Sequence, residues 1–310
     1  MSITGVLRSG LMQLRVLDLE KAVTHYVERL GMDEVGRDPA TKRVFLKCWD
    51  EFDHHSFVLR EANTAGMDLM GFKVQDDAYI DVLERKTKAF GLNCKMIPAN
   101  SDQPGYGRRL AVDLPTGHRF DFFAEAEMAK DHPQIYNPDI WQKEPHGMGV
   151  SCFDHALLYG PNSKEAVRYC TEVMGMGVVE VAKLPDGSGD LCTWMTSANR
   201  THDVAILEYE QPGKLHHVGF KLEDWSQVGH AADLISIHDI ALDAGPMRHG
   251  VTRGKTIYFF DPSGNRDEVY AGGYAYYPDM PTREWDFDHV GKGIFYYTRE
   301  LNDNFLAVVT

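Results

Sequence analysis

Apolar residues recur along this chain with helical spacing in some segments and with strand-like spacing in others. The segment 164–176, KEAVRYCTEVMGM, follows the helical period, and its apolar residues share one face: Ala166, Tyr169, Cys170, Val173 and Met174. Asn162 precedes this segment and is followed three residues later by Glu165, which predicts a capping box. Gly175 is expected to end the helix.

Strand-like segments surround this helix. One of them, FDHALLYG, precedes it, and others follow it at residues 177–184, 190–196 and 203–210. The cycle then restarts with a strand at 216–222, a helix at 223–235 and strands at 238–245 and 255–262. The pattern therefore predicts the order strand, helix, strand, strand, strand, repeated along the chain.

Three segments of the first half match three segments of the second half in the same order. EKAVTHYVERLGM aligns with KEAVRYCTEVMGM without a gap, MGFKVQD with VGFKLED, and LPTGHRFDFF with DPSGNRDEVY. Such a series of matches indicates an internal duplication. We therefore expect an α+β fold in which each half contains two β-α-β-β-β modules. Helices would cover one face of a curved mixed sheet, and the other face would form a cup.

A segment rich in Pro, Asn and Gly lies between the two halves and predicts a boundary. We expect an N-terminal domain over residues 1–130, a linker over 131–149, a C-terminal domain over 150–273 and a tail over 274–310. The tail has no partner in the first half and is expected to pack near the ligand-binding cup.

The strand HHVGFKL contains two adjacent histidines, and the aligned copy in the first half has none. Because successive strand residues point to opposite faces, His216 is expected on the apolar, helix-covered face. His217 is expected on the face that opens into the cup, together with Gly219 and Lys221. We therefore interpret His217 as a candidate ligand, and His216 as a partly buried structural residue that cannot serve the same site.

Two further residues of the second half complete a possible metal site. His155 lies on the first strand of that half, and Glu268 lies on its last strand. Two histidines and one carboxylate are the ligand set of non-haem Fe(II) oxygenases, although any one of them alone is more often structural. The aligned residues of the first half are Leu11 (or Gly10, one register away), Leu69 and Asp121. The sequence therefore predicts a metal site in the second half and none in the first.

Three more polar residues are placed to act on a substrate. His202 lies in NRTHDVAILE, His249 in GPMRHGVTRGK and Tyr258 in KTIYFF. The alternative for the two histidines is an exposed loop position, and spacing alone does not decide between these roles. The alternative for Tyr258 is an aromatic core residue.

Composition narrows the classes of partner. The chain of 310 residues carries a formal net charge of −14 without a cluster of basic residues, so neither nucleic acid nor a membrane is an expected partner. No apolar run is long enough to span a bilayer or to form a signal peptide. Five irregularly spaced cysteines are typical of reduced thiols, and we expect a cytoplasmic protein.

The segment RHGVTRGKTIYFFDPSGNRDE resembles the signature of the extradiol ring-cleavage dioxygenases, of the catechol 2,3-dioxygenase type within the vicinal oxygen chelate superfamily. The matching parts are His249, the pair Ile257-Tyr258, the turn 261–264 and Glu268. Met247 departs from the pattern, where the family has a smaller residue. The resemblance extends over the whole chain, including LHHVGF and the tail GKGIFYYTRELNDNF.

The resemblance implies a function and roles for particular residues. His155, His217 and Glu268 match the family's iron ligands, and His202 matches its acid–base histidine. His249 and Tyr258 match the residues that contact the substrate hydroxyls. The expected pocket walls, chosen from sequence neighbourhood and resemblance, are Trp194, Thr252, Ile294 and Phe305.

The implied reaction is cleavage of catechol or an alkylcatechol by O₂ beside the diol. Its product would be 2-hydroxymuconic semialdehyde or a substituted analogue, formed during degradation of aromatic hydrocarbons. The implied cofactor is a single Fe(II), with Mn(II) as the alternative because both ions accept the same ligands. Members of the family are usually homotetramers.

Two other classes of protein share the expected fold. Metal-dependent isomerases or lyases of the glyoxalase kind usually take four ligands from more than one module, whereas this chain offers three from one half. Metal-free proteins that bind small aromatic molecules need no His/His/Glu set. Formation of a yellow product from catechol, Fe(II) and air would separate the dioxygenase from both.

Overall fold

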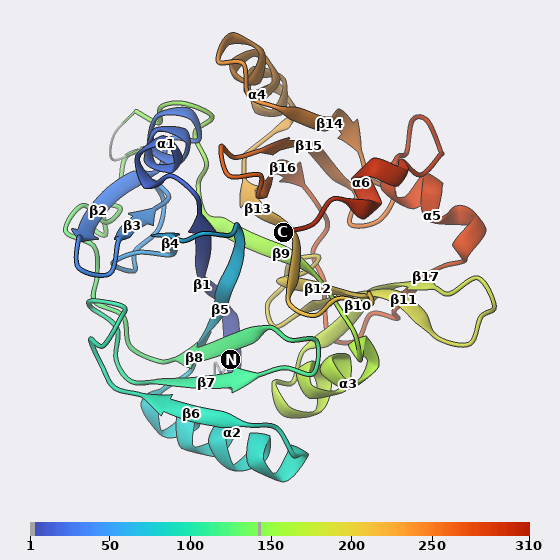
Figure 1. The fold of residues 1–310 in the computed structure, drawn as a ribbon, viewed down its shortest axis with the longest axis horizontal. Coiled ribbons are helices and arrows are strands. Elements are labelled where there is room, and N and C mark those ends of the chain that lie inside the picture. Colours follow the sequence, from blue (N-terminus) through green and yellow to red (C-terminus); the bar gives the residue numbers. More distant parts are fainter. Residues whose placement is uncertain (1–3, 142–143) are drawn as a thin grey trace.

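The computed structural model describes residues 4–141 and 144–310, and these form two mixed β-sheets with helices on their outer sides (Figure 1). The first sheet and its helices are, in chain order, β1 (Val6–Val16), α1 (Leu19–Val23), the π-helix η1 (Thr24–Arg29), β2 (Asp33–Asp38), β3 (Arg43–Lys47), β4 (Phe57–Glu61), β5 (Gly66–Val74), α2 (Asp77–Phe90), β6 (Cys94–Ile97), β7 (Arg109–Asp113) and β8 (Arg119–Phe123).

The second sheet repeats this series and then adds the tail. Its elements are β9 (Phe153–Gly160), α3 (Ser163–Arg168), the π-helix η2 (Tyr169–Val173), β10 (Gly177–Lys183), β11 (Asp190–Thr196), β12 (Val204–Glu208), β13 (Lys214–Lys221), α4 (Trp225–Ile237), β14 (Leu242–Arg248), β15 (Gly254–Phe260), β16 (Arg266–Gly272), β17 (Arg283–Trp285), α5 (Phe287–Ile294) and α6 (Asp303–Ala307). The order strand, helix, strand, strand, strand therefore occurs four times, which confirms the α+β fold expected from the duplication.

The two sheets have matching topologies. The strand order is β2-β3-β4-β1-β5-β8-β7-β6 in the first and β14-β15-β16-β13-β9-β12-β11-β10-β17 in the second. In each half, the first strands of the two modules lie side by side and antiparallel: β1 with β5, and β9 with β13. Each of these central strands also pairs in parallel with the last strand of its own module. This arrangement places four strands at the middle of each cup.

The helix over residues 164–176 forms with a change of winding. It begins as α3 and continues as η2, and the corresponding helix of the first half changes from α1 to η1 in the same way. The five apolar residues expected on its inner face are all buried. The capping box is wrong, because Asn162 adopts a left-handed conformation with φ 56° and makes no side-chain cap. Glu208 accepts a hydrogen bond from the Ser163 N–H instead.

The two halves share one apolar core on their helix-covered faces. Phe220 of β13 packs against Phe57 of β4, with ring centroids 5.2 Å apart, and against Tyr26 of η1 at 6.3 Å. Polar contacts also cross the boundary, because the Ser9 hydroxyl on β1 donates to the backbone carbonyl of Asp154 and to Asp203. The first half therefore supports the strands and loops of the second directly.

The tail returns to the second sheet. Strand β17 pairs in parallel with β10, and the backbone of Thr310 exchanges two hydrogen bonds with Leu215 at the start of β13. In Figure 1 the C-terminus lies at the centre of the molecule, close to β9 and β13. The described part of the linker, residues 131–141 and 144–149, forms no helix or strand. No helix among the described residues is both long and apolar enough to cross a membrane.

Candidate metal centre and active site

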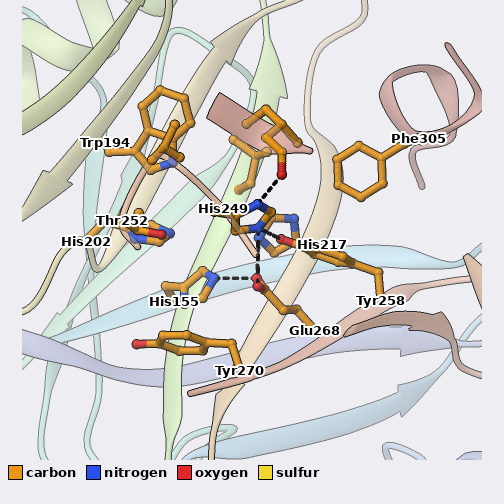
Figure 2. Close-up of a pocket in the computed structure, with 13 residues that line it drawn as sticks. His155, Trp194, His202, His217, His249, Thr252, Tyr258, Glu268, Tyr270 and Phe305 are labelled. Atoms are coloured by element: carbon orange, nitrogen blue, oxygen red, sulfur yellow. Dashed lines mark hydrogen bonds and ion pairs between the residues drawn. The ribbon is translucent and has the colours of Figure 1, made fainter. Parts of the chain in front are cut away.

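Three polar side chains from three neighbouring strands meet in the second cup. His155 comes from β9, His217 from β13 and Glu268 from β16, and all three are buried. One possible ligand atom of each lies within 4.8 Å of the others. Figure 2 shows the two imidazoles and the carboxylate converging from different strands. Residues that are 113 positions apart in sequence therefore come together because β13 lies between β9 and β16.

A glycine at the middle of β13 makes this convergence possible. Gly219 is paired with His155 on one side and with Glu268 on the other. A Cβ atom on Gly219 would lie 2.3 Å from Cε1 of the His155 ring, far closer than van der Waals contact. The missing side chain therefore provides the space in which the His155 ring lies across the strand.

The position of His216 corrects the expectation from strand alternation. The pairing of β13 with β9 shifts register between Leu215 and His217, as it does where a β-bulge inserts one residue. Leu215 and Val218 both pack in the helix-covered core. The His216 ring instead stacks on the Tyr159 ring, with centroids 4.9 Å apart, and Tyr159 belongs to the apolar cluster on the cup face of the sheet. Both histidines therefore face the cup side, and the prediction that they lie on opposite faces is wrong.

Each of the three candidate ligands has a hydrogen-bond partner behind it. His155 Nδ1 donates to the Asp154 carboxylate at 2.9 Å. The Thr256 hydroxyl donates to Glu268 Oε1 at 2.5 Å, and His217 Nδ1 lies 2.8 Å from Nδ1 of His216. Such partners fix the orientation of metal-binding side chains and, for histidines, the tautomer. The remaining atoms, Nε2 of each histidine and Oε2 of Glu268, face one another.

The charge balance of this cluster favours a bound cation. Burial alone would lower the pKa of His155, but Glu268 and Asp154 outweigh it and raise that pKa to about 9. At His217 burial dominates and lowers the pKa to about 4. His217 Nε2 is buried and lies 3.2 Å from Glu268 Oε2, and it has no hydrogen-bond partner among the described residues. The donor set of two imidazoles and one carboxylate therefore fits a divalent transition metal that would replace the His155 proton.

His202, His249 and Tyr258 all reach the same cavity (Figure 2). The His202 ring packs on His155 with centroids 4.1 Å apart, and its buried Nδ1 has no hydrogen-bond partner in the part of the chain that the structure describes. Burial, reinforced by His155, holds the pKa of His202 well below its usual value, so its imidazole is neutral near pH 7. The alternative that His202 and His249 are exposed loop residues is wrong, because both side chains are buried.

His249 and Tyr258 form a hydrogen-bonded pair beside Glu268. His249 Nδ1 lies 2.5 Å from the Ile294 carbonyl, which can only accept, so Nδ1 carries the proton. In the neutral ring Nε2 is then the acceptor of the Tyr258 hydroxyl proton at 2.8 Å. Burial lowers the pKa of His249, and burial with the nearby Glu268 charge raises that of Tyr258 well above its usual value. Both groups are therefore neutral in the free protein.

The four residues expected as pocket walls all line the cavity. They are Trp194, Thr252, Ile294 and Phe305, the last two contributed by the tail. A second cavity of about 290 Å³ adjoins the first and shares Trp194, Ile294, Phe305 and Leu157 with it. Its lining is almost entirely apolar and includes Tyr159, Leu207 and Leu301. An apolar space therefore opens beside the polar cluster.

Sequence reasoning missed several residues that support the site. Thr256 and Tyr270 lie two positions from Tyr258 and Glu268 on the same strands, so strand alternation could have found them. The Tyr270 hydroxyl donates to Asp154, which in turn holds His155. Asp154 and His216 are direct chain neighbours of the ligands, and no periodicity in the sequence indicates their contacts.

Comparisons with known proteins agree with this geometry. Residues 67–127 match the model of the catechol 2,3-dioxygenase-like N-terminal domain. Residues 152–269 match that of the Glyoxalase/Bleomycin resistance protein/Dioxygenase superfamily. The metapyrocatechase of Pseudomonas sp. strain CF600 is 44% identical over 307 residues, which cover 99% of each chain. A manganese-dependent 2,3-dihydroxybiphenyl 1,2-dioxygenase of Geobacillus genomosp. 3 is 27% identical over 96% of this chain and 95% of its own.

Solved structures show the same architecture. The 2,3-dioxygenase LapB of Pseudomonas sp. KL28 superposes with a TM-score of 0.89 at 45% identity, over 93% of this chain and 99% of its own. Homoprotocatechuate 2,3-dioxygenase of Brevibacterium fuscum gives a TM-score of 0.86 at 25% identity, over 98% and 92% of the two chains. The full-length match and the shared fold show that this chain belongs to the extradiol ring-cleavage dioxygenases, in the metapyrocatechase (catechol 2,3-dioxygenase) family.

Proposed function

We propose that this protein cleaves the ring of catechol or an alkylcatechol beside the diol, using O₂ and a single Fe(II). The product would be 2-hydroxymuconic semialdehyde or its substituted analogue, a step in the degradation of aromatic hydrocarbons. One observation carries the proposal: the buried His155, His217 and Glu268 meet in one cup beside the neutral His202. The similarity to metapyrocatechase supports it independently.

The proposed metal ligands are His155 Nε2, His217 Nε2 and one carboxylate oxygen of Glu268. A divalent metal held there would lower the pKa of a catechol hydroxyl and bring the diol and O₂ together. Because Glu268 is the only anionic ligand proposed, a singly ionised catechol would balance the remaining charge in the buried site. Mn(II) is the alternative ion, and the manganese-dependent relative keeps that alternative open.

The chain's own residues would handle the protons. His202 is neutral and has a free buried Nδ1, so it can accept a proton from a bound diol and later return it. The Tyr258 hydroxyl donates a hydrogen bond to His249 Nε2, so the phenol oxygen can still accept a hydrogen bond from a ligand in the cavity. We propose His202 as the acid–base residue, with His249 and Tyr258 contacting the substrate.

The proposed ring pocket is closed by Trp194, Thr252, Ile294 and Phe305. The adjoining apolar cavity of about 290 Å³ would accept an alkyl substituent of the ring without a buried polar group left unpaired. Burying each methylene group of such a chain contributes about 0.8 kcal/mol. This cavity supports alkylcatechols as substrates alongside catechol.

The direct test adds Fe(II) and catechol to the metal-free protein without oxygen and then admits ¹⁸O₂. We expect a yellow product that carries two ¹⁸O atoms and forms only with the metal present. A parallel sample with Mn(II) distinguishes the two ions by their rates. Binding of catechol without turnover under both metals would favour a protein that sequesters aromatic molecules. Turnover of another substrate without O₂ uptake would favour an isomerase or lyase.

Further proposals concern the domain boundaries, the oligomeric state and the cellular location of the protein. We propose that residues 1–130 form a domain without a metal site, that 131–149 link it to the catalytic domain of 150–273, and that 274–310 close the active site. Exposed apolar side chains gather next to and within the linker, at Met128, Ile135, Tyr136, Ile140 and Trp141, which supports a homotetramer. Free thiols at all five cysteines support a cytoplasmic location. Light scattering of the purified protein tests the assembly.

A further inference from the structure

His216 is fully buried between the tail and His217. Its Nε2 lies 2.8 Å from the backbone carbonyl of Phe305 in α6, and its Nδ1 lies 2.8 Å from Nδ1 of His217. The rings of Tyr159 and Phe305 enclose it, with centroids 4.9 and 4.8 Å from its own. The bulge in β13 produces this arrangement, because it turns His216 and His217 toward the same side.

The chemistry of these atoms fixes where each proton lies. A carbonyl oxygen only accepts, so Nε2 of His216 must carry the proton that it donates to Phe305. In a neutral ring Nδ1 is then an acceptor, and Nδ1 of His217 must be its donor. Nε2 of His217 is consequently left with a lone pair, and this is the nitrogen that faces Glu268 without a hydrogen bond.

We propose that His216 is a positioning residue that sets the tautomer and ring orientation of His217 for metal binding. The Phe305 carbonyl accepts from His216 Nε2, so His216 Nδ1 must accept from His217 Nδ1, and this second hydrogen bond fixes the proton of His217. The proposal rests on the metal centre proposed above, and it adds a role to a residue that alternation placed on the opposite face. His217 is thereby oriented by a neutral imidazole, whereas His155 is oriented by the Asp154 carboxylate.

The same contacts connect the tail to the metal ligand. Phe305 supplies its carbonyl to His216, and its ring packs on Tyr258 with centroids 4.9 Å apart. Displacement of α6 would remove the acceptor that keeps His216 in its present tautomer. The free His216 ring could then offer a proton to His217 Nδ1, and His217 would present Nε2–H to the metal. An ordered tail is therefore a condition for tight metal binding.

Three substitutions separate the two hydrogen bonds of His216. His216→Leu removes both hydrogen bonds and fills the space with an apolar side chain of similar size. His216→Asn keeps an amide oxygen near the Nδ1 position, where it can accept from His217. His216→Gln keeps an amide nitrogen near the Nε2 position, where it can donate to Phe305. His55→Leu is the matched control, since His55 is equally buried and pairs with His54 Nδ1 at 2.9 Å in the first half.

The first measurement is the Mn(II) dissociation constant of each metal-free, full-length variant, from the electron paramagnetic resonance signal of free Mn(II). We expect His216→Leu and His216→Gln to weaken binding by about 10–100-fold. His216→Asn should restore affinity to within a few-fold of the unsubstituted protein, and His55→Leu should leave it unchanged. Unchanged affinity in His216→Leu, or rescue by Gln and not by Asn, would overturn the proposal.

The second measurement reads the tautomer without any metal. Nitrogen-15 spectra of the metal-free protein should show His217 protonated at Nδ1, and this signal should be lost in His216→Leu and kept in His216→Asn. Protonation of His217 at Nε2 in the unsubstituted protein would refute the proposal. The two failures are distinguishable: a protein that binds Mn(II) in the cup yet turns over no catechol refutes the proposed function alone.

Discussion

The two cups of this molecule have the same backbone topology and differ in the side chains that fill them. In the second cup His155 and Glu268 flank Gly219, and in the first cup Leu11 and Asp121 flank Gly71 in the same register. Apolar and aromatic side chains fill the first cup: Leu11, Phe45, Val58, Leu69, Tyr106 and Phe123. The same strands therefore build a packed interior in one half and a ligand site in the other.

Both cups have a carboxylate at the equivalent position, Asp121 in the first and Glu268 in the second, and the two carboxylates have different partners. Asp121 accepts from the buried Arg109 at 2.7 Å and from Arg119 at 2.6 Å, so its charge is already compensated. Among the described residues Glu268 has no arginine partner; it faces two imidazoles and a threonine hydroxyl. A carboxylate on this strand becomes a candidate metal ligand only where no internal cation compensates it.

The largest expected effect comes from exchanging the two carboxylates for amides. Glu268→Gln should abolish metal retention and lower turnover by at least about 1,000-fold, because the site loses its only anionic ligand. Asp121→Asn should leave metal content unchanged but destabilise folding by on the order of 3 kcal/mol, because Arg109 loses its buried partner. Metal analysis and urea unfolding of both variants measure the contrast.

These two variants act as controls for each other. Metal loss in Asp121→Asn without unfolding would mean that the first cup contributes to the metal site. Full metal content in Glu268→Gln would mean that Glu268 is not a ligand. Either result would contradict the claim that the metal site belongs to the second cup alone.

The next largest effect concerns proton transfer, which we assign to the second cup alone. His202→Asn should reduce kcat by about 100- to 10,000-fold while metal content stays the same, because the acid–base group is lost and the ligands are not. Single-turnover kinetics with catechol, together with metal analysis, measure this. A loss of metal equal to the loss of activity would assign His202 to the metal site instead.

Adding one methyl group to each central glycine tests the packing difference. Gly219→Ala should weaken metal binding by about 10–100-fold, because the new Cβ displaces the His155 ring. Gly71→Ala places a Cβ 2.7 Å from the Leu11 Cβ and should cost about 1–3 kcal/mol of stability with no change in metal affinity. Equal metal affinities in the two variants would contradict the role assigned to Gly219.

The last prediction concerns folding stability and expects no effect on the metal site; it rests on a buried histidine of the first half. His118 contacts the Lys214 carbonyl of β13 at 3.0 Å, and burial lowers its pKa to about 4. Below pH 6.5 the unfolded chain binds a proton that the folded chain refuses, so stability should fall as the pH decreases from about 6.5 towards 4. The loss is up to about 3 kcal/mol, at about 1.4 kcal/mol per pKa unit.

Urea unfolding between pH 4 and 7 measures this slope. His118→Gln should make it shallower by the share of His118, because glutamine has no group that titrates in this range. The buried His55, His217 and His249, whose pKa values are also lowered, keep the rest of the slope. An unchanged slope in the variant would mean that other buried groups cause the loss of stability, and the contact with Lys214 would then have no part in it.

Local patterns predicted most of the fold because they repeat. The periods of apolar residues predicted the order of strands and helices in each module. The duplication aligned Asp121 with Glu268 and left Leu11 or Gly10 as the equivalent of His155, and the strand pairing shows that Leu11 is that equivalent. The capping box failed because the sequence spacing of Asn162 and Glu165 does not reveal a left-handed backbone at Asn162. The structure instead satisfies the helix start through Glu208, a residue distant in sequence.

The site was predicted less completely, for a physical reason. Alternation assumes an uninterrupted strand, and the bulge after Leu215 shifts His216 to the opposite face. The contact of His216 with Phe305 joins residues 89 positions apart, and that of His155 with Glu268 joins residues 113 apart. Such contacts depend on the packing of the tail and sheet, which no local pattern contains.

The most direct test is an anomalous-scattering map, at the iron absorption edge, of crystals grown without oxygen in the presence of Fe(II) and catechol. We predict one iron peak per chain, bonded to His155, His217 and Glu268, with both catechol oxygens beside it and His202 facing them. An iron peak in the first cup, or a second cup that holds catechol without iron, would contradict this prediction.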